Sequence, residues 1–209
     1  MKQIDLWFDP ISPFAYLAFE HLPQALVGCS YAVEYRPLLF AGLLNHWGQK
    51  GPAEIEAKRI WTYRHIAWLA HQYGTVLQMP AVHPFNPLAL LRLCIAAGAN
   101  RRVVEAVMRH VWRGGADAAD AARIDALTRE LAPARDPSSV EVKAELRANT
   151  DAAIRLGVFG VPTFELEGRL FWGLDALPML RAALLGDAWF DGAVWDEAAT
   201  PPPGVSRQR

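Results

Sequence analysis

Near the start of the chain, the apolar positions change from a strand pattern to a helix pattern within a few residues. Residues 4–8 are apolar apart from one acid, which is typical of a strand buried on both faces. An Asp-Pro pair ends this run, and Ser12-Pro13 then combines a capping serine with a proline at the first helical position. The mostly apolar continuation predicts a helix over about 13–27. The Ser12 hydroxyl therefore lies where free backbone N–H groups and the positive end of a helix dipole converge, which suits an anion.

The rest of the pattern predicts a small sheet whose strands come from both ends of the chain. A second strand is expected over 31–36, and a loop over 38–45. Five helical patterns follow, over residues 53–73, 87–97, 100–112, 119–131 and 139–156. A hairpin over 163–166 and 169–172 and a last helix over 176–185 complete the order. A sheet with a helical insertion fits this order, because the two ends of the chain must meet to complete the sheet.

Size, composition and charge narrow the class of protein. A chain of 209 residues with 52% hydrophobic content can bury a substantial core. A net charge of −1 gives no reason to expect nucleic acid or an anionic membrane as a partner. No apolar run approaches the roughly 18 residues of a membrane span. The start of the chain enters a strand at once without a signal-peptide pattern, so a cytoplasmic protein is expected.

The two cysteines exclude one class of chemistry. Cys29 and Cys94 form no C-x-x-C pair, which rules out a dithiol redox centre at the first helix. Neither has metal-ligand spacing with the six histidines, and no metal site is expected. Cys94 lies in an apolar run and is interpreted as a core thiol.

A second motif, near the other end of the chain, indicates a functional role for Ser12 besides helix capping. Taken alone, Ser12 is explained as well by helix capping as by chemistry, since every helix needs a cap. The run from Gly157 to Leu166 contains Val-Pro-Thr-Phe after two glycines and leads into the hairpin. It is similar to the cis-proline loop of a thioredoxin-type fold, which faces the start of the first helix. The two motifs together are more specific than either alone.

The order of motifs resembles a known family. These are Trp-Phe-Asp-x-x-Ser-Pro-Phe-Ala-Tyr-Leu from residue 7, Gly-Val-Phe-Gly-Val-Pro-Thr-Phe from residue 157 and Phe-Trp-Gly-x-Asp-x-Leu from residue 171. The stretches 45–54 and 83–87 match as well. Together they resemble the 2-hydroxychromene-2-carboxylate isomerases, relatives of kappa-class glutathione transferases within the DsbA-like thioredoxin superfamily. The resemblance covers residues 4 to about 186.

The resemblance implies an α/β, thioredoxin-like fold with an inserted all-helical subdomain. The thioredoxin-like part would comprise residues 1–40 and 157–190, and the helical insertion residues 41–156. Residues 191–209 would form a tail that is partly disordered, since the end of the chain carries three prolines and no apolar pattern. Relatives are often dimers, so a homodimer is expected by analogy.

The resemblance also implies a glutathione site. Ser12 would hold the glutathione sulfur as a thiolate, and Val161, before a cis Pro162, would present its backbone N–H and C=O to the cysteinyl unit. Leu174 and Asp175 would receive the γ-glutamyl group, with Asp175 against its ammonium. The family commonly has a small polar residue and Asp-Arg where this chain has Leu-Asp-Ala, so a side-chain hydrogen bond from position 174 is lost while its backbone N–H remains.

Substrate contacts are expected around this site. Asn45 and Lys50 would lie over it, near the substrate carboxylate or the glycine end of glutathione. Lys50 or Arg64 could hold the carboxylate of a small aromatic substrate, and Trp47 and Tyr63 could enclose its ring. From the residues alone, the segment around Trp47 is equally a surface loop, and Arg64 belongs to a solvated helix face.

Three functions remain open at this point. The first is a glutathione-dependent isomerase of 2-hydroxychromene-2-carboxylate or a similar aromatic-degradation intermediate, which works by thiolate addition, bond rotation and elimination. The second is a kappa-type glutathione transferase or peroxidase with the same cofactor site. The third is a non-catalytic protein that binds a thiol or peptide in the cis-proline groove. Ser12 as a nucleophile in its own right is disfavoured, because the sequence has no Gly-x-Ser-x-Gly elbow around it.

Overall fold

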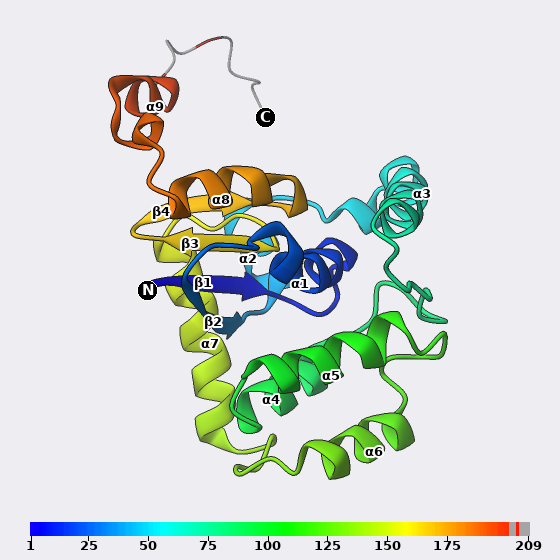
Figure 1. Cartoon of the computed structure of the whole chain (residues 1–209). Coiled ribbons are helices and arrows are strands. Elements are labelled where there is room, and N and C mark those ends of the chain that lie inside the picture. The colour runs from blue at the N-terminus through cyan, green and yellow to red at the C-terminus, as the bar shows by residue number, and fades with distance from the viewer. Residues whose placement is uncertain (201–203, 205–209) are drawn as a thin grey trace.

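The computed structural model describes residues 1–200 and Gly204. In this part of the chain one mixed four-stranded sheet runs through the molecule in the order β2–β1–β3–β4 (Figure 1). The strands are β1 (Lys2–Phe8), β2 (Tyr31–Pro37), β3 (Thr163–Leu166) and β4 (Arg169–Trp172). β1 pairs parallel with β2 and antiparallel with β3, which in turn pairs antiparallel with β4. β1 and β3, which come from opposite ends of the chain, therefore meet at the centre of the sheet, as the sequence pattern predicts.

Helices cover both faces of this sheet. On one face, Ile4, Leu6 and Phe8 of β1 share a core with α1 (Pro13–Ala25) and α8 (Leu177–Leu184). On the other face, Trp7 packs with residues of α2 and α7. The alternation of β1 between two apolar layers explains why Ile4, Leu6, Trp7 and Phe8 are all apolar and buried.

The chain between β2 and β3 is helical. Its helices are α2 (Phe40–Trp47), α3 (Glu56–Gln72), α4 (Leu88–Ala96), α5 (Arg101–Trp112), α6 (Ala121–Leu131) and α7 (Val140–Arg155), with the short 3₁₀ turn η1 (Pro52–Glu54) before α3. Figure 1 shows α4, α5 and α6 gathered on one side of the sheet and α3 at the margin of the molecule. Buried residues of α5 belong to the same core as β1 and α1, so the helices and the sheet share one apolar interior. The residue limits of the inserted subdomain stay a prediction.

The loop expected over 38–45 is wrong, because the chain forms α2 there. No side chain of the helix's own N-terminus caps it. Its first N–H groups are instead satisfied by distant residues: Leu39 N–H donates to Thr150 Oγ1 at 3.0 Å, and Phe40 N–H to Asp9 Oδ2 at 2.9 Å. Gly42 lets α2 approach α7 closely, since a Cβ there would lie 2.9 Å from Thr150 Cγ2. These partners are invisible to a local pattern, which is why sequence reasoning missed the helix.

The helix expected over 176–185 is confirmed as η2 (Leu174–Ala176) followed by α8, but it is not the last. The chain continues through η3 (Ala188–Asp191) into α9 (Ala193–Ala198). Phe190 is buried, and Trp195 packs in the same core as Phe171. Of the partly disordered tail expected over residues 191–209, residues 201–203 and 205–209 lie outside the described residues.

No helix in residues 1–200 is both long and apolar enough to cross a membrane.

Candidate functional site

Ser12 connects the two motifs that the sequence singled out. Its Oγ accepts the N–H of Ala15 at 3.2 Å, which confirms the helix cap. The same hydroxyl donates to the carbonyl oxygen of Val161 at 3.2 Å, across 149 positions of sequence. The Val161–Pro162 peptide is cis, as the motif indicates. Ser12 is only 7% exposed, so this hydroxyl is largely shielded from water.

Residues 173–175, which follow β4, lie next to the cis-proline loop. The N–H of Gly173 donates to the carbonyl of Pro162 at 2.9 Å, which sets Leu174 and Asp175 beside the cis-proline loop. Residues of α1 and η2 are also in contact. Leu174 is buried in the core, whereas the Asp175 side chain is exposed. The Leu174 side chain thus packs in the core, and its backbone N–H makes no hydrogen bond within the described residues.

Several backbone donors around Ser12 have no partner. Within the described residues, no acceptor in the chain engages the N–H groups of Phe14, Val161, Leu174 or Asp175. Val161 and Leu174 are buried, where a partnerless N–H group is uncommon, whereas Phe14 is half-buried and Asp175 is exposed. Two of them lie at helix N-termini, where the helix dipole adds to their attraction for negative charge. The arrangement can bind an extended ligand that carries anionic groups.

A buried acid that sequence reasoning missed holds the turn before Ser12. The carboxylate of Asp9 accepts the N–H of Ile11 and that of Phe40, both at 2.9 Å. Burial raises the pKa of Asp9 to about 7, although the two backbone hydrogen bonds lower it. Asp9 therefore ties the Ser12 turn to the first residue of α2. The available signal was an acid at the end of an apolar strand, which we interpreted only as a strand breaker.

Two more side chains hold this turn through its carbonyl groups. The indole Nε1–H of Trp112 donates to the carbonyl of Pro10 at 2.9 Å. Nε2 of His83 lies 2.8 Å from the carbonyl oxygen of Ile11. His83 precedes a second cis peptide bond, His83–Pro84, in one of the segments that resemble the isomerase family. Sequence reasoning noted this segment without assigning its histidine a role.

Of the residues expected to contact the substrate, two make hydrogen bonds to segments near Ser12 and the others are exposed to solvent. Trp47 donates its Nε1–H to the carbonyl of Val158 at 2.9 Å, which anchors α2 to the segment that precedes the cis-proline loop. The hydroxyl of Tyr63 lies 2.7 Å from Nδ1 of His83. Asn45, Lys50 and Arg64 are exposed. Within the described residues, no hydrogen bond or ion pair joins them to Ser12 or to the cis-proline loop. Their contact with a substrate stays a prediction.

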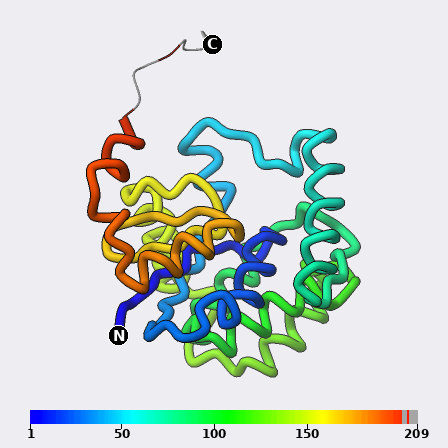
Figure 2. Tube along the Cα trace, turned by 45° about the horizontal axis from the view of Figure 1, so that its top comes forward, coloured from blue at the N-terminus to red at the C-terminus, as the bar shows by residue number. Residues whose placement is uncertain are grey.

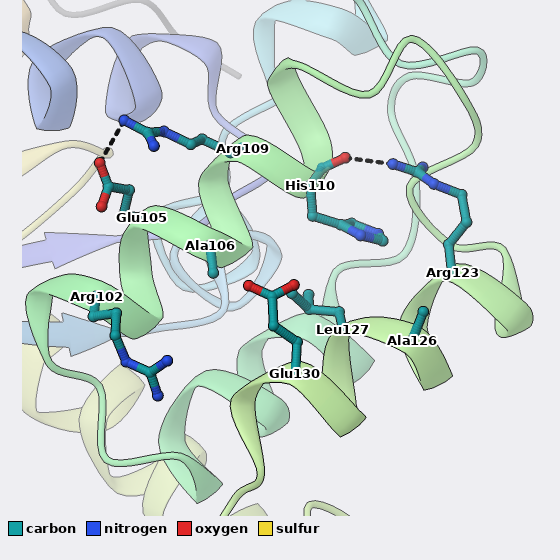
Figure 3. Close-up of a pocket in the computed structure, with 9 residues that line it drawn as sticks. All are labelled: Arg102, Glu105, Ala106, Arg109, His110, Arg123, Ala126, Leu127 and Glu130. Atoms are coloured by element: carbon teal, nitrogen blue, oxygen red, sulfur yellow. Dashed lines mark hydrogen bonds and ion pairs between the residues drawn. The ribbon is translucent and has the colours of Figure 1, made fainter.

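A separate hollow of about 480 Å³ lies between α5 and α6 (Figure 3). It is lined by Arg102, Glu105, Ala106, Arg109, His110, Arg123, Ala126, Leu127 and Glu130. None of the site residues predicted from sequence lines it. Two of its half-buried arginines are already engaged, since Arg109 pairs with Glu20 at 3.3 Å and Arg123 donates to the carbonyl of His110 at 2.8 Å. The described residues contain no group of three or more His, Cys, Asp or Glu side chains placed to hold a metal ion.

Comparison with known proteins places this geometry in a family. The family model for the DSBA-like thioredoxin domain matches residues 3–185. A 2-hydroxychromene-2-carboxylate isomerase of Pseudomonas putida is 30% identical over 87% of this chain and 93% of its own length. Glutathione S-transferase kappa 2 of Caenorhabditis elegans is 26% identical over 86% of this chain and 90% of its own.

Among solved structures, a 2-hydroxychromene-2-carboxylate isomerase superposes with a TM-score of 0.76 at 26% identity. The match covers 92% of this chain and 98% of the other. The chain therefore belongs to the family of DSBA-like thioredoxin domains, and its resemblance to the 2-hydroxychromene-2-carboxylate isomerases within that family is confirmed.

Proposed function

We propose that this protein is a glutathione-dependent isomerase of 2-hydroxychromene-2-carboxylate or of a similar aromatic-degradation intermediate. One observation carries the proposal: the hydroxyl of Ser12 lies 3.2 Å from the carbonyl of Val161, among backbone donors that have no partner in the part of the chain that the structure describes. The similarity to isomerases over most of the chain supports the reaction class.

The groups around Ser12 fit glutathione. The hydroxyl of Ser12 and the N–H of Phe14 suit a thiolate, because both are donors at the positive end of α1. The N–H and C=O of Val161 suit the cysteinyl backbone, which would add as a short strand. The N–H groups of Leu174 and Asp175 suit the γ-glutamyl carboxylate, and the Asp175 carboxylate suits the ammonium beside it.

The Ser12 hydroxyl has one hydrogen, so it can donate either to the carbonyl of Val161 or to a ligand sulfur, but not fully to both. In the present structure the hydroxyl donates to Val161. When it donates to a sulfur atom instead, the carbonyl of Val161 becomes free to accept an N–H from the ligand. A free thiol has a pKa near ~8.5 and is mostly protonated at neutral pH. Each unit by which the site lowers that pKa corresponds to about 1.4 kcal/mol of preference for the thiolate.

Bound glutathione would supply a thiolate that adds reversibly to the conjugated, ring-opened substrate, so that a double bond becomes single, rotates and re-forms on elimination. The protein's part is to keep the thiol ionised, to hold the substrate and to exclude side reactions. Trp47 and Tyr63 would enclose the aromatic ring of the substrate, and their hydrogen bonds to Val158 and His83 support this proposal, because both partners belong to segments next to the Ser12 turn or the cis-proline loop. Lys50 or Arg64 could hold the substrate carboxylate from the exposed side.

The experiment that tests the proposal is a calorimetric titration with glutathione across pH, on the native protein and on Ser12→Ala. We expect binding at micromolar to low-millimolar concentration, with proton release near neutral pH that Ser12→Ala reduces. The native protein is then assayed with 2-hydroxychromene-2-carboxylate.

Ser139→Ala is the matched control. Ser139 caps α7 by accepting the N–H of Val142 at 3.3 Å, so its loss removes a serine cap without touching the site. It should leave glutathione binding and proton release unchanged. Absence of binding by the native protein at millimolar glutathione would refute the proposal.

A kappa-type glutathione transferase is the second candidate, since kappa-class relatives match the chain over a similar length. It would use the same glutathione site with a different second substrate. Conjugation of an electrophilic aromatic compound, without isomerisation of the hydroxychromene, would favour this candidate.

A further inference from the structure

A polar chain of two side chains links α3 to the peptide bond before Ser12. His83 lies between them: its Nε2 is 2.8 Å from the carbonyl oxygen of Ile11, and its Nδ1 is 2.7 Å from the hydroxyl of Tyr63. The residue before each of the two cis prolines therefore contacts this turn. Val161 does so by its carbonyl and His83 by its ring.

The chemistry of the three groups fixes the direction of this chain. A carbonyl oxygen only accepts, so Nε2 of His83 carries the hydrogen that Ile11 receives. Nδ1 is then an acceptor, 2.7 Å from the Tyr63 hydroxyl, and the carbonyl oxygen of His83, at 3.1 Å, is a second and more distant acceptor for the same hydroxyl. Burial lowers the pKa of His83, which favours the neutral ring that this arrangement needs. The sequence of donors is therefore Tyr63 to His83 to Ile11.

The helix that carries Tyr63 has little apolar anchorage of its own. Within α3, only Ile66 and Ala70 are buried. Trp61 and Trp68 are 66% and 56% exposed, and Figure 2 shows the helix at the margin of the molecule.

A second contact of α3 also reaches the site. His65 meets the ring of Phe14 edge-on, with centroids 5.8 Å apart. Phe14 follows Ser12 by two positions and supplies one of the partnerless N–H groups. The polar chain and this aromatic contact together set α3 against the start of α1.

We propose that Tyr63 and His83 are positioning residues for Ser12, acting through the Ile11–Ser12 peptide. By holding the Ile11 carbonyl, they fix the orientation of the turn from which the Ser12 hydroxyl and the Phe14 N–H point at a ligand sulfur. Tyr63 thus serves the site by its hydroxyl, which is committed to His83. This inference rests on the proposed function for its catalytic consequence.

The test uses Tyr63→Phe, which removes one hydroxyl and keeps the ring. In the unliganded protein, the NMR signal of the Ser12 amide should shift, because the loss of the Tyr63 hydroxyl weakens the hold of His83 on Ile11. With glutathione bound, ultraviolet absorbance of the thiolate should show its pKa raised by about half a unit to one unit. We expect kcat to fall about tenfold while KM for the aromatic substrate changes less.

Two further variants separate positioning from general damage. Tyr73→Phe makes the same substitution at the end of α3, where the ring stacks on His21, and should leave every signal unchanged. His83→Gln keeps an N–H that can reach Ile11 and should retain more activity than His83→Ala. Adding Tyr63→Phe to His83→Ala should cause little further loss, because one link of the chain is already absent.

The outcomes are distinguishable. An unchanged Ser12 amide signal and an unchanged thiol pKa in both Tyr63→Phe and His83→Ala would overturn this inference. A native protein without any thiolate signal would overturn the proposed function. The Ser12 amide shift, which needs no glutathione, would still report whether Tyr63 and His83 position the turn.

Discussion

The Ser12 turn and the hollow between α5 and α6 both gather polar groups, but they differ in which groups lack a partner. At the hollow, Arg109 and Arg123 are engaged by other groups of the protein, while Arg102 and Glu130 are exposed to water. At the Ser12 turn, the main chain at Val161 and Leu174 is buried and its N–H groups have no acceptor within the described residues. The hollow has a volume of about 480 Å³, yet its polar groups need no ligand.

This difference shows what marks a binding site in a fold of this kind. A buried donor without an acceptor costs free energy unless a ligand or ordered water satisfies it, so its persistence needs an explanation. An open space lined by satisfied or hydrated charges needs none. The predictions below change one region or the other, in order of expected effect.

The largest effect should be on the pH dependence of the free energy of unfolding, and it should come from Asp9, whose buried carboxyl joins the Ser12 turn to α2. Its pKa is raised from 3.8 to about 7, so the folded protein keeps a proton that the unfolded chain releases. The stability that this proton provides is fully present below about pH 4 and is lost as pH rises through about 7. Over that interval the contribution is about 4 kcal/mol at most.

Urea unfolding at several pH values tests this on the native protein and Asp9→Asn. The free energy of unfolding of the native protein, relative to that of Asp9→Asn, should fall as pH rises from about 4 to 7 and then level off. Burial lowers the pKa values of His21, His83 and His110, which gives the opposite slope, but these contributions are common to both proteins and cancel. A pH-independent difference would contradict the burial of an ionisable Asp9.

Asp9 also shows where sequence reasoning ended. The Ser12 cap was predictable from neighbouring residues, and the cis-proline loop from the similarity of its motif to that of thioredoxin-type folds. Asp9, Thr150 and His83 act across 31, 111 and 72 positions, on backbone groups that no periodicity identifies. Sequence reasoning missed α2 for the same reason, because its capping partners are Asp9, directly after β1, and Thr150 in α7. Local preference thus predicted most elements, whereas the contacts that orient the site depend on the tertiary fold.

The second largest effect should come from Ser12→Ala, which removes the hydroxyl from the turn and leaves the hollow intact. We expect kcat for the isomerisation to fall between about a hundredfold and a thousandfold, as for loss of one preorganised donor to a developing anion. Loss of the cap should also cost about 1 kcal/mol of stability. Steady-state kinetics and thermal unfolding measure the two effects separately. Ser139→Ala should show only the loss of stability, and equal kinetics in Ser12→Ala and the native protein would contradict the role of Ser12.

Asp175→Asn should have a smaller effect, confined to binding. It keeps the shape of the side chain and the backbone N–H groups of η2 but removes the charge opposite the proposed ammonium. We expect the Kd for glutathione to rise about tenfold, with kcat at saturating glutathione nearly unchanged. Calorimetry gives the Kd, and Asp187→Asn, a neighbouring acid that accepts the N–H of Trp189 at 3.0 Å, is the control. An unchanged Kd would place the γ-glutamyl group elsewhere.

The smallest effect should come from the hollow itself. Arg102 and Glu130 are exposed there, so Arg102→Ala and Glu130→Ala remove charges that water already solvates. We expect less than about a twofold change in glutathione affinity and in kcat, and stability within about 0.5 kcal/mol of the native protein. Kinetics at matched salt concentration measure this, since long-range charge effects depend on screening. A tenfold loss of activity in either variant would show that volume, rather than partnerless buried donors, marks the working surface of this fold.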